Sequence, residues 1–192
     1  MDPRFDPIWI DVGQVLQRTV TSLYSHLVTR PTGRAVRMAI EARLQSAGAR
    51  SISLIDLSEV VILDFSCADE VVARLVEDAT RSPTHEAFFV FRGVHEPHRE
   101  QIESVLERRG LATVAETGPG TFQLLGTRTV GEERIWSEVE RRGLVDPDDI
   151  GDLAVDAEDL LALESVLERR LVFRNPSSGR VHALSRLVQH IT

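Results

Sequence analysis

The apolar residues between the amino terminus and Leu125 switch repeatedly between a spacing typical of strands and a spacing typical of helices. A short run at residues 52–57 is apolar at most positions, as in a buried strand, and residues 87–91 give the strongest strand signal in the chain. Between such runs the apolar residues recur every three or four positions. The expected elements are strands at residues 8–12, 52–57, 87–91, 111–115 and 121–125, and helices at 15–28, 34–46, 66–79 and 97–109, with Pro31 and Gly33 as breaks between helices.

Strand and helix alternate from residue 52 to residue 115, and this order predicts the class of the fold. A crossover through a helix returns the chain in the same direction, so the strands are expected to pair in parallel within an open sheet. The alternation ends at residues 126–131. We therefore predict an α/β domain at residues 1–126 and a boundary between domains just after it.

The pattern from residue 132 to residue 192 differs from what precedes it. Helical spacing is present around residues 135–144, 147–154 and 160–167, and a hairpin is expected around the turn at residues 175–179. Three helices followed by a two-stranded wing resemble winged helices in their general layout. We predict a small α+β domain of this winged-helix-like kind at residues 132–192.

Composition and charge limit the function classes. The 192 residues carry 30 acidic and 22 basic side chains, all of the basic ones arginine, for a net charge of -8. Such a molecule repels nucleic acid and anionic membranes unless it has a local basic patch. Cys67 is the one cysteine, so an internal disulfide is excluded, and the first ten residues lack the pattern of a signal peptide. We expect a cytoplasmic protein that does not bind membranes.

The segment from Ile55 to Glu70, IDLSEVVILDFSCADE, resembles the signature of STAS domains, the anti-anti-sigma-factor fold. In that family a strand ending in Asp-Leu-Ser leads through an apolar loop to an Asp and a Ser that opens a helix. The resemblance extends over residues 52–125, with Cys67 where the family often has Gly. It implies a STAS-like open sheet with helices and a signalling function through protein partners, a kinase-like or regulatory protein among them.

Ser66 aligns with the serine that a partner kinase phosphorylates in the antagonist branch of this family. As a helix N-cap with Asp69 three residues later, it also matches a plain capping pattern, and Asp69 and Glu70 suit the positive end of a helix. A phosphoryl group here would meet Asp64, Asp69 and Glu70. We therefore take these four residues as a phospho-switch or partner surface, with a structural cap as the alternative.

Arginines form one basic cluster in the first domain, at Arg30, Arg34 and Arg37, with Arg43 farther along. Guanidinium groups bind carboxylates and phosphates, so this cluster could contact an anionic partner. A solvated helix face balanced by Glu41 explains the same residues.

The carboxy-terminal domain could bind DNA or protein. Residues 127–192 contain nine arginines against thirteen acidic residues, and the third helix carries Glu158, Asp159, Glu164 and Glu168. A DNA reader needs a basic recognition helix and wing. The candidate contacts are Arg169, Arg170, Arg174 and Arg180. We favour protein contact, and keep a DNA-binding transcriptional regulator as the alternative.

We expect no catalysis, no cofactor and no metal. Asp64, Asp69 and Glu70 lack a nucleophile, a phosphate-binding loop or a histidine partner, and His95 and His98 have no third ligand nearby in the sequence. The prediction from sequence is thus a non-catalytic regulatory protein that binds other proteins.

Overall fold

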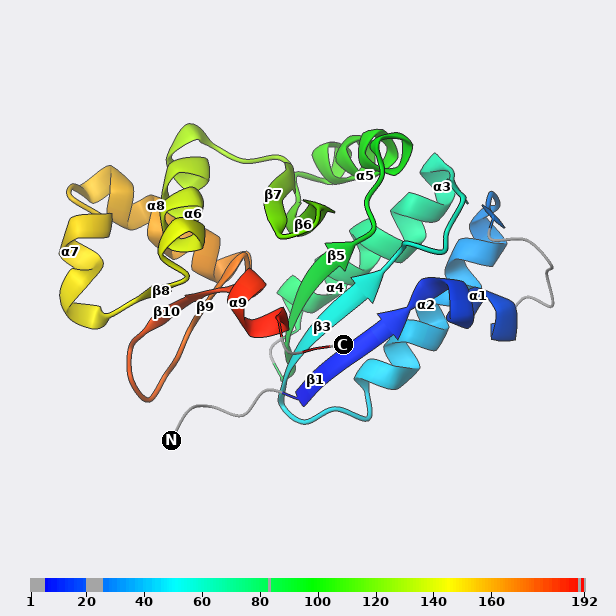
Figure 1. Cartoon of the computed structure of the whole chain (residues 1–192), viewed down its shortest axis with the longest axis horizontal. Coiled ribbons are helices and arrows are strands. Elements are labelled where there is room, and N and C mark those ends of the chain that lie inside the picture. The colour runs from blue at the N-terminus through cyan, green and yellow to red at the C-terminus, as the bar shows by residue number, and fades with distance from the viewer. Residues whose placement is uncertain (1–5, 20–25, 83, 190, 192) are drawn as a thin grey trace.

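Five strands form the main sheet of the protein in the order β1-β3-β5-β6-β7. The computed structural model describes residues 6–19, 26–82, 84–189 and 191 (Figure 1). Strands β1, β3, β5 and β6 pair in parallel, and β7 pairs with β6 antiparallel. The bounds are β1 Asp6–Asp11, β3 Arg50–Asp56, β5 Glu86–Arg92, β6 Ala112–Gly118 and β7 Thr121–Gly126. The predicted α/β class is confirmed.

Helices that connect these strands cover one face of the sheet. They are α1 Val12–Thr19, α2 Arg30–Leu44, α3 Phe65–Ala68, the π-helical turn η1 Asp69–Ala73, α4 Arg74–Arg81 and α5 Glu96–Arg109. Ile55, Phe89 and Phe91 point from the strands into the core beneath them. Two further strands, β2 His26–Leu27 and β4 Ile62–Leu63, form a separate two-stranded parallel sheet.

The described part of the carboxy-terminal segment forms four α-helices, a 3₁₀ turn and a small antiparallel sheet in the order β8-β10-β9. Its elements are α6 Val130–Arg142, β8 Leu144–Val145, η2 Pro147–Asp149, α7 Ile150–Leu153, α8 Ala157–Glu168, β9 Val172–Arg174, β10 Val181–Ala183 and α9 Leu184–Val188. The sequence did not predict β8 or α9. Both are short, and Leu144 extends the helical spacing of α6 although Gly143, with a φ of 73°, has already ended that helix.

This segment packs on the face of the main sheet that α1 to α5 leave open. Ile52, Leu54 and Phe88 belong to the same buried cluster as Trp136 and Phe173. The rings of Phe88 and Phe173 meet edge to face with centroids 5.5 Å apart. Figure 1 shows α6 to α8 and the small sheet on the side of the molecule opposite α1 and α2. Independent folding of residues 1–126 and 132–192 stays a prediction, but the two segments share this core.

Two of the expected local structures are wrong. Leu27, expected in a helix, belongs to β2, while residues 20–25 of that expected helix lie outside the described residues. Pro31 and Gly33, expected as breaks, lie inside the first turns of α2, which begins at Arg30 with Thr29 as its N-cap. Proline fits a first helical turn because its missing N–H has no partner there.

Gly33 has a packing role in α2. A Cβ at this position would lie 2.9 Å from Cα of Cys67. The missing side chain therefore lets α2 approach α3 closely.

No helix in the described part of the chain is long and apolar enough to cross a membrane.

Candidate functional site

Two groups of charged residues that the sequence analysis assigned to separate surfaces contact each other. Nη1 of Arg30 donates to Oδ2 of Asp69 and to Oε1 of Glu70, each at 2.9 Å. Nε of Arg37 donates to Oε2 of Glu70 at 3.3 Å, and Arg37 also pairs with Glu41. The candidate anion-binding arginines thus neutralise the candidate acidic surface.

Two further arginines complete this cluster from other helices. Nε of Arg109, at the end of α5, donates to Oδ1 of Asp69 at 2.8 Å, and its Nη1 donates to Glu77 at 2.8 Å. Nε of Arg74 lies 3.5 Å from Oε1 of Glu70, one turn earlier in the same helical segment. Sequence reasoning missed both. The i, i+4 spacing of Glu70 and Arg74 was a signal for the second, whereas no local pattern links Asp69 to Arg109.

The π-helical turn η1 lies at the base of the cluster. Adjacent residues of an α-helix point roughly 100° apart. Asp69 and Glu70 nevertheless both accept hydrogen bonds from one nitrogen of Arg30, and both are at the start of η1. Single π turns inside α-helices occur frequently at functional sites. The local backbone therefore directs two neighbouring carboxylates toward the same arginine, Arg30.

Two carboxylates of this cluster are buried, so breaking their ion pairs costs more stability than breaking exposed pairs. Asp69 and Glu70 are 8% and 2% exposed. Burial acts to raise the pKa of Asp69, but hydrogen bonds from Arg109 and Arg30 outweigh it and hold the pKa below its usual value. A buried carboxylate that stays ionised needs such partners, because desolvation penalises its charged form.

A pocket of about 370 Å³ opens beside the cluster, and we call it the arginine pocket. It is lined by Arg30, Phe65, Asp69, Arg74, Arg108 and Arg109. Arg108, an exposed residue, lies over the ring of Phe65 at 6.0 Å from its centroid. Guanidinium groups stack on aromatic faces in this way. Helices α2, α3, α4 and α5 and the turn η1 each contribute at least one lining residue.

The start of α3 differs in detail from the prediction. The N-cap is Asp64, whose Oδ1 accepts from the backbone N–H of Cys67 at 2.8 Å. Ser66 is the second residue of α3, and its hydroxyl donates to the same Asp64 oxygen at 2.9 Å. The expectation that Ser66 is the N-cap, with Asp69 completing a capping box, is therefore wrong. Asp and Ser are both good N-caps, and the residue that precedes the helix by one position takes that role.

Ser66 remains half-buried next to the arginine pocket, which begins at its neighbour Phe65. Of the three acidic residues grouped with it, Asp64 contacts it directly, while Asp69 and Glu70 are engaged by arginines. Charge added at Ser66 therefore meets the carboxylate of Asp64 directly, while arginines compensate the charges of Asp69 and Glu70. The sequence analysis expected it to meet three carboxylates.

Cys67 is fully buried, and its thiol donates to the backbone oxygen of Thr29 at 3.0 Å. Burial, with the nearby charge of Asp64, raises the pKa of Cys67 to about 12. Since the thiolate is the reactive form, this thiol is a packing residue between α2 and α3.

Arg34, another member of the predicted basic cluster, faces outward. It is exposed, and no ion pair joins it to another side chain within the described residues. Arg30 is half-exposed and Arg37 is mostly buried, both in ion pairs.

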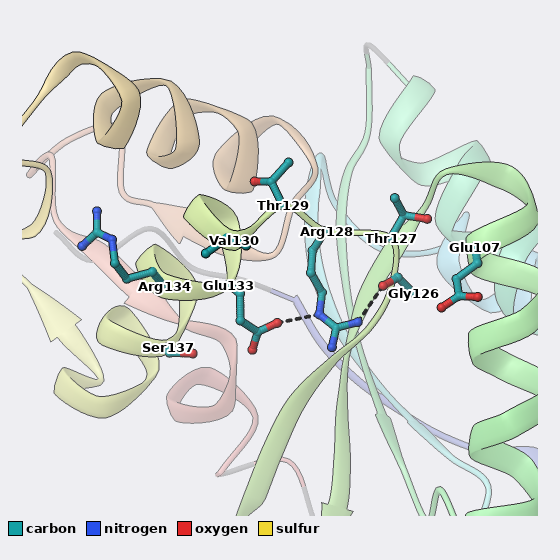
Figure 2. A pocket seen from close by; sticks show the side chains of 9 residues that line it. All are labelled: Glu107, Gly126, Thr127, Arg128, Thr129, Val130, Glu133, Arg134 and Ser137. Carbon is teal, nitrogen blue, oxygen red and sulfur yellow. Dashed lines mark hydrogen bonds and ion pairs between the residues drawn. The ribbon is translucent and has the colours of Figure 1, made fainter.

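A second depression, of about 820 Å³, lies at the junction between β7 and α6. Figure 2 shows Arg128 reaching across it between Glu133 and the backbone oxygen of Gly126. Nε of Arg128 is 2.5 Å from Glu133, and its Nη1 donates to Gly126 at 2.7 Å. The charges here pair with each other across an open surface, and Val130 is 88% exposed.

The two arginines at the end of α8 hold the carboxy-terminal segment in place. Nη1 of Arg169 donates to Oε1 of Glu132 at 2.7 Å. Arg170 donates to the backbone oxygens of Ser82, His85 and Ala87, at 3.0, 3.2 and 3.3 Å, and so links the end of α8 to the start of β5 and the segment before it. Of the other two predicted contacts, Arg180 pairs with Asp146 at 2.6 Å and Arg174 is exposed.

The outer side of α8 is acidic and apolar. Leu160 and Leu161 are 49% and 71% exposed, and Val155 just before the helix is 78% exposed. The acidic residues Glu158, Glu164 and Glu168 are also exposed. This composition is unfavourable for contact with a phosphate backbone.

Compared with protein-family models, curated proteins and solved structures, the chain shows no significant match. Within the part of the chain that the structure describes, no group of three or more His, Cys, Asp or Glu side chains has the geometry to hold a metal ion.

Proposed function

We propose that this chain is a non-catalytic regulatory protein that binds protein partners through a STAS-like domain, with the start of α3 on the docking surface. The observation that carries the proposal is the position of Ser66. Its half-buried hydroxyl is bonded to the helix cap Asp64 at 2.9 Å and is one residue from the arginine pocket.

A phosphoryl group on Ser66 would change this surface strongly. It carries about -1.5 to -2 charges near neutral pH, and it would replace the proton that Ser66 shares with Asp64. Repulsion from Asp64 would weaken the cap of α3, while attraction would draw the group toward the arginines of the pocket. Both effects would move the phosphoryl group away from Asp64 and toward the pocket. A single modification would therefore alter the shape and the charge that a partner contacts.

The order of elements supports the two domain types. Residues from β3 to β6 follow the parallel strand-helix alternation that the STAS resemblance implies. The carboxy-terminal order α6-β8-α7-α8-β9-β10, with β10 between β8 and β9, supports a winged-helix-like module.

Protein contact suits this module better than DNA contact. Three of its four candidate DNA-contacting arginines, Arg169, Arg170 and Arg180, are bonded within the chain. The helix at the recognition position presents leucines and glutamates to solvent. The DNA-binding alternative requires a complex that persists at physiological salt, and we expect none.

The test is an affinity purification from the native cell, followed by calorimetric titration of the recovered partner. Wild type is compared with Ser66→Ala, Ser66→Asp and the control Ser137→Asp, which adds the same charge to an exposed position on α6. We expect Ser66→Asp to change the partner affinity at least fivefold while Ser137→Asp leaves it unchanged. Equal affinities for all four folded proteins would reduce Ser66 to a structural residue.

A further inference from the structure

The arginine pocket has more positive charge than its own carboxylates neutralise. Four arginines line it: Arg30, Arg74, Arg108 and Arg109. The carboxylates that contact them are Asp69, Glu70 and Glu77. Two of these also pair with an outer arginine, Glu70 with Arg37 and Glu77 with Arg81, and Glu41 in turn pairs with Arg37. The cluster as a whole thus holds six arginines and four carboxylates. About two positive charges therefore remain at the pocket.

The arginines also keep hydrogen-bond donors that these carboxylates do not use. A guanidinium group has five N–H donors. Within the described residues, Arg108 forms no ion pair and contacts the ring of Phe65, and Nε of Arg74 is buried without a hydrogen-bond partner. Arg30 bonds through Nη1, and Arg109 through Nε and Nη1. Donors from several helices thus surround one cavity of about 370 Å³.

The ion pairs with Asp69 and Glu70 fix the positions of the arginines that make them. Arg30 and Arg109 are each held by a buried carboxylate, so less side-chain entropy is lost when they bind a second anion. Stacking on Phe65 does the same for Arg108. A preorganised set of guanidinium groups with two spare charges matches a phosphate dianion, which accepts several charge-assisted hydrogen bonds.

We infer that the arginine pocket is a binding site for the phosphoryl group of a phosphate monoester. This inference goes beyond the proposed regulatory function, because the pocket can be tested without any partner protein.

The test is a calorimetric titration of the full chain with inorganic phosphate and with phenyl phosphate, at constant ionic strength set with chloride. We expect saturable binding of one phosphate with a Kd on the order of 1 mM. Binding of both phosphates should weaken as the pH falls from about 8 to about 5, because each takes up a proton over this range and loses its second negative charge, whereas sulfate stays a dianion and should bind equally at the two pH values. The absence of saturable binding at concentrations about tenfold above that Kd would overturn the inference.

Variants locate the binding. Arg108→Gln and Arg74→Gln remove charges whose side chains do not hold the core together, so both proteins should fold, which thermal unfolding checks. Each should weaken phosphate binding at least fivefold. Arg34→Gln removes an exposed arginine from α2, outside the pocket, and should leave binding unchanged. Equal weakening in all three variants would show nonspecific attraction and overturn the inference.

The phosphoryl group could come from a free monoester or from Ser66 itself, and one further variant separates these sources. If Ser66→Asp weakens phosphate binding at least fivefold, the added carboxylate competes for the pocket, and Ser66 is the source. If Ser66→Asp binds phosphate as wild type does, the pocket serves a free ligand. If the wild-type protein binds no phosphate but Ser66→Asp still changes the affinity for the partner, this inference alone is rejected and the proposed function stands.

Discussion

Nη1 of Arg30, in the first turn of α2, donates to Oε1 of Glu70 in the π-helical turn at 2.9 Å. The two residues are 40 positions apart in the chain. The side chain of Glu70 is 3% exposed, whereas that of Arg30 is 48% exposed. This bond therefore connects a buried carboxylate to a half-exposed guanidinium group at the rim of the arginine pocket.

Glu70→Gln should destabilise the protein by about 3 kcal/mol, at the low end for a broken buried ion pair, because Arg30 and Arg74 can turn toward water but Arg37 cannot. The matched control is Glu133→Gln, which breaks an exposed pair with Arg128 and should cost less than about 1 kcal/mol. Denaturant unfolding measures both free energies. Equal costs would mean that the buried cluster contributes no more than a surface pair.

Gly33→Ala should destabilise the protein by about 1 to 3 kcal/mol, although alanine is the better helix former. The new Cβ would lie 2.9 Å from Cα of Cys67, which is backbone and cannot move easily. Gly151→Ala in α7 is the control, since its Cβ would have no neighbour within 4 Å. It should stabilise by about 0.5 to 1 kcal/mol. A stabilising Gly33→Ala would contradict the close approach of α2 and α3.

Arg170 has a φ of 58°, an uncommon conformation for a residue other than glycine. Glycine would relieve this strain but would lose the three hydrogen bonds to Ser82, His85 and Ala87. We expect Arg170→Ala to cost about 2 kcal/mol and Arg170→Gly about 1 kcal/mol less than that. The exposed Arg174→Ala should change stability by less than about 0.5 kcal/mol. If Arg170→Gly is more stable than wild type, the three hydrogen bonds that link α8 to the sheet domain contribute less stability than the backbone strain costs.

His98 is 2% exposed, and burial lowers its pKa. The unfolded chain therefore binds this proton more readily than the folded protein does. The contribution of His98 to stability is complete above about pH 6.5 and is lost as the pH falls toward the folded pKa. Between pH 7 and pH 5, wild type should lose stability more steeply than His98→Gln.

Glu140 changes stability in the opposite sense, because burial raises its pKa, but it is present in both proteins and cancels in the comparison. An NMR titration of the His98 ring gives the folded pKa directly. A value at or above 6.5 would contradict the prediction.

The sequence predicted those elements whose structure depends mainly on their own residues. The apolar runs of β3 and β5 predicted buried strands, their alternation with helices predicted parallel pairing, and the helical spacing that ends at Gly110 predicted α5. Those runs also indicated that both sheet faces are covered, because residues such as Leu54 and Ile55 point to opposite faces and are both buried. That signal could have located the carboxy-terminal segment on the open face, but a run of apolar residues does not name the element that covers it.

The site depended on contacts that no local pattern records. Asp69 and Glu70 suit the start of a helix as well as they suit a buried cluster, and only the fold brings Arg30 and Arg109 to them. Arg170 is similar, since its carbonyl partners lie more than eighty residues earlier in the chain. Several charged residues that the sequence predicted as contact surfaces therefore form ion pairs or hydrogen bonds within the protein.

The central claim, that the start of α3 is a regulated docking surface, is tested most directly by titrating the purified partner against wild type and protein carrying phosphoserine at position 66. We predict an affinity change of at least tenfold, about 1.4 kcal/mol, because the added charge disturbs the Asp64 cap and engages the arginine pocket. Identical affinities for the two folded proteins would contradict the claim.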